Sequence, residues 1–154
     1  ICDKTYFEKL GIEYGSIKRL ILTVLSKFEL NCEQERAFRI VAQHVSVSCL
    51  DPLRMYVGGM GGTGKSQFVN ALLHFFAARN CHFAIVVSAP TGNAAALLGG
   101  STYHFLLGLN GQVKYTGKKT LAQVCSRLTG VEYMVLDEVS MLSCVDMYKI
   151  SKRL

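Results

Sequence analysis

The stretch GGMGGTGKS, residues 58–66, places five glycines, a lysine and a serine directly after the apolar run LRMYV at 53–57. It fits the pattern G-x-x-x-x-G-K-[ST] between a predicted strand and a predicted helix. Glycines allow positive φ angles and let backbone N–H groups approach phosphate oxygens that side chains would otherwise block. The stretch therefore predicts a phosphate-binding loop.

Each part of this loop has an expected contact. The N–H groups and the positive dipole end of a helix that begins near Lys65 would point at the phosphates of a nucleoside triphosphate. Lys65 would reach the β and γ phosphates, and the Ser66 hydroxyl would ligate Mg²⁺. A flexible glycine turn with a solvated lysine is the plain alternative. The residues expected to bind the nucleotide here are Gly59, Gly61, Gly62, Thr63, Gly64, Lys65 and Ser66.

A second group of chemical interest is the acidic pair that ends YMVLDE, residues 133–138. Open α/β sheets present ligand-binding groups at the carboxyl ends of their strands. We expect Asp137 to hold Mg²⁺, directly or through water, and Glu138 to orient and deprotonate an attacking water. The pair favours hydrolysis over transfer to a small-molecule acceptor, although both carboxylates could instead be solvated residues of a strand-end turn.

The elements that position these residues follow from the hydrophobic pattern. Short apolar runs at 53–57, 82–87 and 133–137 predict strands covered on both faces, as in a parallel sheet. The stretch 65–80 between the first two runs is long enough for a crossover helix. Its expected buried side chains are Phe68, Leu72, Phe75 and Phe76. The chain is therefore predicted to be an α/β protein.

Five further segments carry helix or turn signals. Apolar residues recur at helical spacing over 16–30. In the next helix Asn31 can cap the N-terminus, and Gln34 can close a capping box. A helix is also expected after PTGN, and another in TLAQVCSRL at 120–128, while residues 99 and 100 predict a glycine-rich turn.

The composition limits the classes of protein to which the chain can belong. The chain has 154 residues, 50% hydrophobic and 18% charged, which is typical of one folded domain. Six cysteines without a C-x-x-C pair argue against a zinc site and a disulfide framework, and predict reduced, mostly buried thiols. A net charge of +6 suits a polyanionic partner but is also compatible with an ordinary basic protein. The apolar runs are too short for a membrane span, and no signal peptide is recognisable, so we expect an intracellular protein without a membrane partner or metal cluster.

Four blocks, LNCEQERAF, GGMGGTGKS, SAPTGNAAALLGGSTYHFLLG and YMVLDEVSML, occur in this order. Together they resemble the first motifs of PIF-type DNA helicases of superfamily one, particularly the helicase part of Helitron transposable elements. The resemblance covers roughly residues 29–154. It implies a P-loop NTPase with a RecA-like parallel sheet flanked by helices, at 31–154, preceded by an N-terminal helical extension at 1–30.

The resemblance also implies a function. Such proteins use ATP and Mg²⁺ to move 5′ to 3′ on single-stranded DNA and to unwind duplexes at junctions, in repair or recombination. The nucleus is the expected compartment, with the mitochondrion as the alternative. By position, Gln34 would contact the adenine; the residue pattern alone gives it only the helix cap, and it could do both.

The DNA contacts implied by the resemblance fall in the third block. Pro90, Thr91 and Gly92 would form the turn that meets the DNA backbone, with Thr91 and nearby N–H groups donating to phosphate. His104 and Phe105 would support or touch the strand by stacking. The residue pattern leaves open a simple turn at the first site and a core-packing role for Phe105.

The family pattern continues with a motif that senses the γ-phosphate and with a second RecA-like domain, whose arginines complete the ATP site. This sequence contains neither, so we expect an incomplete first motor domain that binds ATP weakly and hydrolyses it very slowly. Two alternatives stay open. One is a non-catalytic nucleotide- or DNA-binding remnant of a transposon helicase, and the other is a different P-loop NTPase or a small-molecule kinase.

Overall fold

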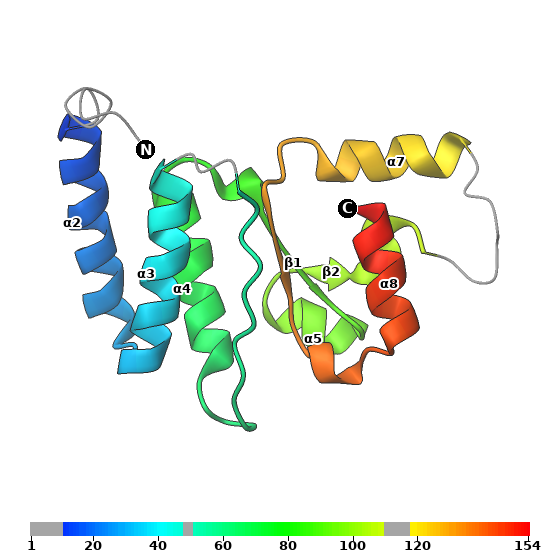
Figure 1. The fold of residues 1–154 in the computed structure, drawn as a ribbon, viewed down its shortest axis with the longest axis horizontal. Helices are drawn as coiled ribbons and strands as arrows, with labels where there is room; N and C mark the ends of the chain where they lie inside the picture. Colours follow the sequence, from blue (N-terminus) through cyan, green and yellow to red (C-terminus); the bar gives the residue numbers. More distant parts are fainter. Residues whose placement is uncertain (1–10, 48–50, 110–117) are drawn as a thin grey trace. The chain divides into compact units, whose positions relative to one another are not determined.

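The computed structural model describes residues 11–47, 51–109 and 118–154 (Figure 1). The chain divides into two compact units at the junction of Asn80 and Cys81. In the parts of the chain that the structure describes, no helix is both long enough and apolar enough to cross a membrane.

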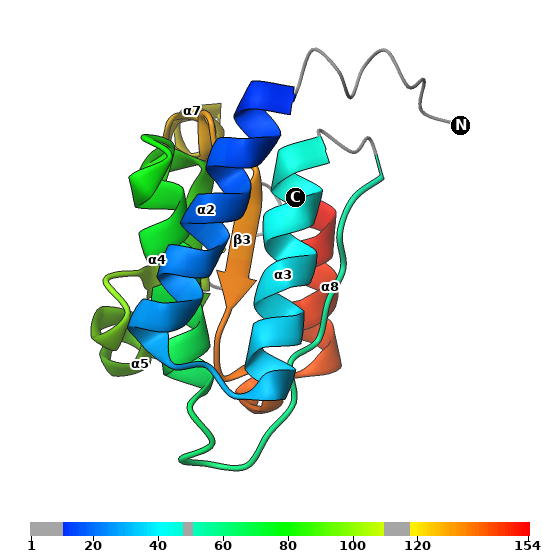
Figure 2. The ribbon, with the colours of Figure 1, turned by 90° about the vertical axis from the view of Figure 1, so that its left-hand side faces the viewer.

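The described residues of the first unit contain three helices, α2 (Gly11–Phe28), α3 (Cys32–Val47) and α4 (Lys65–Ala78). They lie side by side, as Figure 2 shows. Their shared core contains Phe38 and Phe75, whose rings meet edge to face at 5.6 Å. The predicted helices at 16–30 and 65–80 are both present, and the four side chains expected to be buried in the second, Phe68, Leu72, Phe75 and Phe76, are buried.

The prediction of a strand at 53–57 is wrong. These residues belong to an irregular segment that leads into the glycine-rich loop. Leu53 and Val57 are half-buried, but the three residues between them are exposed, and Tyr56 is 78% exposed. A strand needs a neighbour for its backbone hydrogen bonds and, in a parallel sheet, cover on both faces. This run has neither among the described residues, so its apolar composition alone does not make it a strand.

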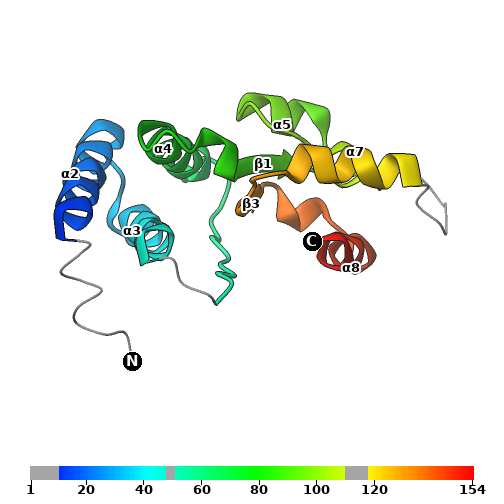
Figure 3. The same cartoon turned by 90° about the horizontal axis from the view of Figure 1, so that it is seen from above.

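The second unit contains a parallel sheet of three short strands, β1 (Ile85–Ala89), β2 (Ser101–Thr102) and β3 (Tyr133–Leu136), in the order β2-β1-β3. Helices cover it, and Figure 3 shows α5 (Gly92–Leu97) and α8 (Cys144–Arg153) on opposite sides of the strands. The other elements among the described residues of this unit are α6 (Tyr103–Leu107), α7 (Lys118–Leu128), η1 (His82–Ala84) and η2 (Val139–Met141). The α/β class is thus confirmed, as is its parallel sheet flanked by helices.

The strand boundaries differ from the predicted ones for local reasons. Residues 82–84 form a 3-10 turn closed by Ala84 N and Cys81 O at 2.9 Å, so the strand predicted at 82–87 begins at Ile85. It continues to Ala89 because Ser88 and Ala89 pair with the unpredicted strand β2. That strand follows the turn expected at 99 and 100, which is present and brings the chain back alongside β1.

The backbone at this turn is tightly packed. A Cβ atom built on Gly100 would lie 2.3 Å from the carbonyl oxygen of Val87 in β1. Real Cβ atoms do not approach a backbone oxygen this closely, so only glycine allows the chain to enter β2 at this distance from β1. The glycine is therefore needed for close approach to the sheet.

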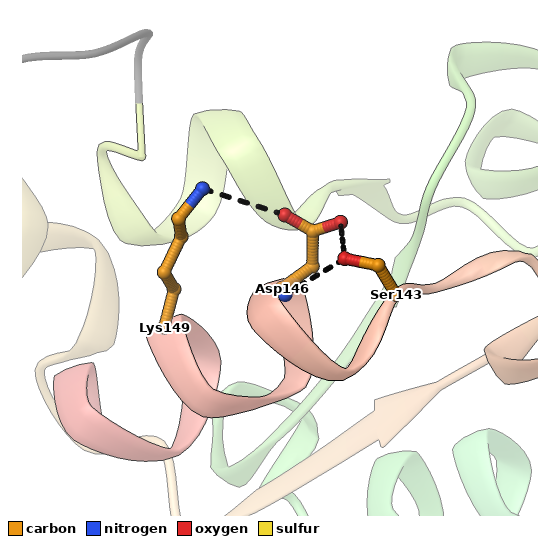
Figure 4. Close-up of polar contacts among 3 residues, drawn as sticks. All are labelled: Ser143, Asp146 and Lys149. Atoms are coloured by element: carbon orange, nitrogen blue, oxygen red, sulfur yellow. Dashed lines mark hydrogen bonds and ion pairs between the residues drawn. The ribbon is translucent and has the colours of Figure 1, made fainter.

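Helix α8, which the sequence pattern did not predict, has a well-defined start (Figure 4). The hydroxyl of Ser143 accepts a hydrogen bond from the backbone N–H of Asp146 at 3.1 Å and donates one to Asp146 Oδ2 at 2.6 Å. The Ser143 hydrogen bond lowers the pKa of Asp146, and Lys149, whose Nζ lies 3.6 Å from Oδ1, acts in the same direction. Burial raises the pKa of Tyr103 in α6, and the charge of Asp146 raises it further.

The prediction of reduced, mostly buried cysteines is partly wrong, because the described cysteines are free but not buried. Cys32, Cys125 and Cys144 are exposed thiols, and Cys81 is half-buried. Cys32 and Cys144 are the first residues of α3 and α8, and Cys125 lies at an exposed position within α7. The other two cysteines, Cys2 and Cys49, lie outside the described residues.

Candidate functional site

The predicted phosphate-binding loop runs directly into α4. Gly62 and Gly64 have φ angles of 79° and 81°, in the left-handed region where only glycine is comfortable. Gly64 is the N-cap residue of α4. Because glycine has no side chain, the cap residue makes no side-chain hydrogen bond to the first N–H groups of this helix. A helix of 14 residues that begins in this way presents amide donors and a positive dipole end to an anion.

The side chain of Lys65 folds back over the loop. Its ammonium Nζ donates to the carbonyl oxygens of Gly59 at 2.7 Å and Met60 at 2.8 Å. The Thr63 hydroxyl also donates to the Met60 carbonyl at 2.8 Å, which closes the turn. Because an ammonium has three donors, Lys65 can hold the loop and still offer a hydrogen to a phosphate oxygen. Ser66 is exposed in the first turn of α4.

Gln34 closes the capping box predicted at the start of α3. Asn31 Oδ1 accepts from the N–H groups of Glu33 and Gln34, and Gln34 Oε1 accepts from the Asn31 N–H at 3.0 Å. In addition, Gln34 Nε2 donates to the carbonyl oxygens of Thr63 and Gly64 in the loop. The cap is thus confirmed, while the adenine contact of Gln34 stays a prediction.

The acidic pair lies where the sequence places it, directly after β3. The Asp137 N–H donates to the Ser88 carbonyl of β1 at 2.8 Å, so the parallel pairing of β1 and β3 extends one residue beyond the strand. Asp137 Oδ1 accepts from the N–H of Glu138 at 2.9 Å. Glu138 is exposed and has a φ of 51°, an unusual conformation for a residue with a side chain. Such positions often occur at functional sites.

The residues expected to meet DNA lie in the second unit. Pro90, Thr91 and Gly92 connect β1 to α5, and the last two are exposed. The Thr91 hydroxyl accepts from the N–H of Ala94 at 3.3 Å and so caps α5. The turn followed by a helix is thus present, and the DNA contact stays a prediction.

His104 and Phe105 are both exposed on α6. The His104 ring lies 4.0 Å from the ring of Tyr103, measured between centroids. Phe105 is 56% exposed, so the core-packing alternative is wrong; instead the guanidinium of Arg127 lies 3.9 Å from the Phe105 ring centroid. Arg127 also donates to the Phe105 carbonyl. The sequence pattern gave no signal for this contact, because the two residues are on different helices.

Comparison with known proteins settles the family. The profile of the family described as PIF1-like helicase matches residues 29–152. The chain belongs to the PIF1-like helicase family. It is 32% identical over 129 residues to a protein of Trypanosoma brucei brucei named ATP-dependent DNA helicase PIF4, and 32% identical over 115 residues to one named ATP-dependent DNA helicase PIF1 from the same organism. The ATP-dependent DNA helicase Pif1 of Bdellovibrio bacteriovorus is 32% identical over 104 residues.

These alignments cover 78%, 74% and 62% of this chain but only 14%, 10% and 23% of the three relatives, in that order. The chain therefore spans a small part of each of them. No solved structure matched the chain in the corresponding comparison.

Proposed function

We propose that this chain contributes the nucleotide-binding part of an ATP-dependent DNA helicase. The observation that carries the proposal is the loop of left-handed glycines at the uncapped start of α4, with Lys65 Nζ held on the loop carbonyls. This arrangement provides converging amide donors and one cation, which is the chemistry that a triphosphate requires. Membership of the PIF1-like helicase family supports the assignment to a DNA motor.

In this proposal the loop from Gly59 to Ser66 binds the phosphates of ATP, and Lys65 contacts the terminal ones. Ser66 and Asp137 are the proposed Mg²⁺ ligands. A hydroxyl and a carboxylate suit this hard cation, and the exposed Ser66 side chain and the Asp137 carboxylate are consistent with that role. When bound, Mg²⁺ would neutralise charge on the β and γ phosphates.

Glu138 is the proposed general base. Its carboxylate would orient the attacking water and take a proton from it as the water oxygen bonds to the γ-phosphorus. The bond from that phosphorus to the β–γ bridging oxygen breaks, so that ADP leaves and phosphate is formed. The backbone of Asp137, tied to β1 through the Ser88 carbonyl, fixes the start of the turn that carries Glu138. The exposed side chain at this turn is open to solvent water.

The finer parts of the proposal rest on the family. We propose single-stranded DNA and duplex junctions as partners, contacted by Pro90, Thr91, Gly92 and His104, with 5′ to 3′ movement in repair or recombination in the nucleus. The net charge of +6 supports a polyanionic partner. A Helitron origin is the proposed context.

Titration calorimetry with ATP and Mg²⁺ tests the nucleotide site. Wild type should bind ATP, and Lys65→Ala should bind it at least tenfold more weakly, because a direct cation contact to phosphate is lost. Lys152→Ala removes the same charge from an exposed position on α8 and should bind ATP as wild type does. Equal affinities of wild type and Lys65→Ala would remove the basis of the proposal.

A further inference from the structure

Both ends of the Gln34 side-chain amide make hydrogen bonds within the first unit. Oε1 accepts from the Asn31 N–H at 3.0 Å, while Nε2 donates to the Thr63 carbonyl at 3.0 Å and to the Gly64 carbonyl at 3.1 Å. An amide has one acceptor atom and two N–H donors. The opposite orientation would place the amide oxygen against two carbonyl oxygens, so the network fixes which end faces the loop.

These two hydrogen bonds also orient the backbone N–H groups of the loop. In a planar trans peptide the C=O and the following N–H point in opposite directions. A carbonyl of Thr63 held toward Gln34 therefore turns the N–H of Gly64 away from Gln34. In the same way, the Gly64 carbonyl is held toward Gln34 and turns the N–H of Lys65 away from it. The Gly64 carbonyl also accepts hydrogen bonds from the N–H groups of Gln67 and Phe68 in the first turn of α4.

The close approach depends on the glycine. A Cβ atom built on Gly64 would lie 2.6 Å from Gln34 Nε2, and the φ of 81° already disfavours any other residue there. Gly64 thus serves two purposes, since it permits the left-handed turn and leaves room for the amide of Gln34. The loop and the start of α3 are consequently packed as one piece.

We propose that Gln34 is a positioning residue for the phosphate-binding loop. By holding the Thr63 and Gly64 carbonyls, it fixes the N–H groups of Gly64 and Lys65 in the orientation that receives phosphate oxygens. The inference rests on the proposed nucleotide binding. It differs from adenine recognition in its ligand dependence: a residue that orients the loop affects every triphosphate equally, whereas one that reads the base affects only adenine nucleotides.

Three variants separate the loop contact from the helix cap. Gln34→Glu keeps an acceptor for the Asn31 N–H, and glutamate suits a capping box, but both donors to the loop are lost. Gln34→Met removes the donors without adding a charge that could repel phosphate. Asn31→Ala is the matched control, because it removes the acceptor for the Glu33 and Gln34 N–H groups and leaves the Gln34 side-chain donors in place.

The dissociation constants of ATP, GTP and inorganic tripolyphosphate are measured for each variant, together with the thermal unfolding midpoint. Two neutral hydrogen bonds correspond to about a tenfold change in affinity. Gln34→Met should therefore bind all three ligands about tenfold more weakly, and Gln34→Glu at least as weakly, because its carboxylate oxygen faces the Thr63 and Gly64 carbonyl oxygens. Asn31→Ala should lower the midpoint and leave all three affinities within about twofold.

Wild-type affinity in Gln34→Met would overturn the positioning role, and a loss confined to ATP would overturn it in favour of base recognition. If wild type binds none of the three ligands, the proposed nucleotide binding is wrong. In that case the carbonyl ¹³C chemical shifts of the nucleotide-free chain still test whether Gln34 holds the loop. The Thr63 and Gly64 carbonyl shifts should change in Gln34→Met and not in Asn31→Ala. Unchanged shifts in Gln34→Met would contradict the inference.

Discussion

The glycine-rich loop of the first unit and the acidic turn of the second are held in different ways. In the described residues 51–57 no strand precedes the loop, which is held by side chains, since Gln34, Thr63 and Lys65 all donate to its carbonyl oxygens. The acidic turn is held by backbone, because the Asp137 N–H continues the pairing of β3 with β1. Side-chain contacts can exchange for a ligand's atoms more readily than a sheet ladder can. The comparison therefore implies a fixed turn and a loop that is adjustable outside the Thr63 and Gly64 carbonyls held by Gln34.

The largest expected effect concerns the fixed turn. Glu138→Gln should slow ATP hydrolysis about 10²- to 10⁴-fold, because the amide cannot accept the proton of the attacking water, while ATP affinity stays close to wild type. Single-turnover hydrolysis, compared with equilibrium binding, measures both quantities.

Glu132→Gln is the matched control for this experiment. Glu132 is an exposed carboxylate just before β3, and its N–H donates to the Ala84 carbonyl, so it lies at the opposite end of the same strand. Its substitution should leave hydrolysis unchanged. An equal loss in both variants, or no loss in Glu138→Gln, would contradict the assignment of Glu138 as the base.

The next prediction compares a glycine of the loop with a glycine that packs against the sheet of the second unit. Gly100→Ala should destabilise the fold by about 1–3 kcal/mol or more, because the new methyl group would meet the Val87 carbonyl oxygen in β1. Gly61→Ala, in the loop, meets nothing within 4 Å and should change the free energy of unfolding by less than about 0.5 kcal/mol. Denaturant unfolding of both variants measures the difference. A loop glycine as sensitive as Gly100 would show that the loop is no more adjustable than the sheet.

The smallest expected effect is a pH dependence at the start of α8. The pKa of Asp146 is lowered by its hydrogen bond with Ser143, so folding favours the ionised carboxylate. Its contribution to stability is present above the unfolded-state pKa of about 3.9 and is lost as the pH falls through the lower folded-state pKa. Thermal unfolding from pH 6 to pH 2 should therefore show a smaller acid-induced decrease in Asp146→Asn than in wild type. Parallel curves would rule out this contribution.

The sequence predicted helices α2, α3, α4, α5 and α7 and the candidate chemistry, because both depend on short-range patterns. The buried side of α4 follows from residues spaced by helical turns, and the capping box from Asn31 and Gln34 three positions apart. The acidic pair follows from its place after an apolar run. In these cases the residues that interact are close together in the sequence, or share one periodicity.

The errors concern contacts between distant segments. The run 53–57 has strand composition but no pairing partner among the described residues, and β2 has only two residues, whose strand character comes entirely from pairing with β1. The contact of Gln34 with Thr63 joins residues 29 positions apart, and no spacing rule connects them. Arg127 and Phe105 pair across two helices in the same way. Such contacts depend on the tertiary fold.

Paramagnetic broadening by Mn²⁺ with ATP, followed in the ¹⁵N spectrum of the chain, tests the central claim most directly. Mn²⁺ replaces Mg²⁺ at oxygen ligands. The proposed roles of Ser66 and Asp137 predict that one equivalent of the metal nucleotide broadens the amide signals of both residues, and that Lys65→Ala abolishes the effect. Broadening that spares Asp137, or that persists unchanged in Lys65→Ala, would contradict the account.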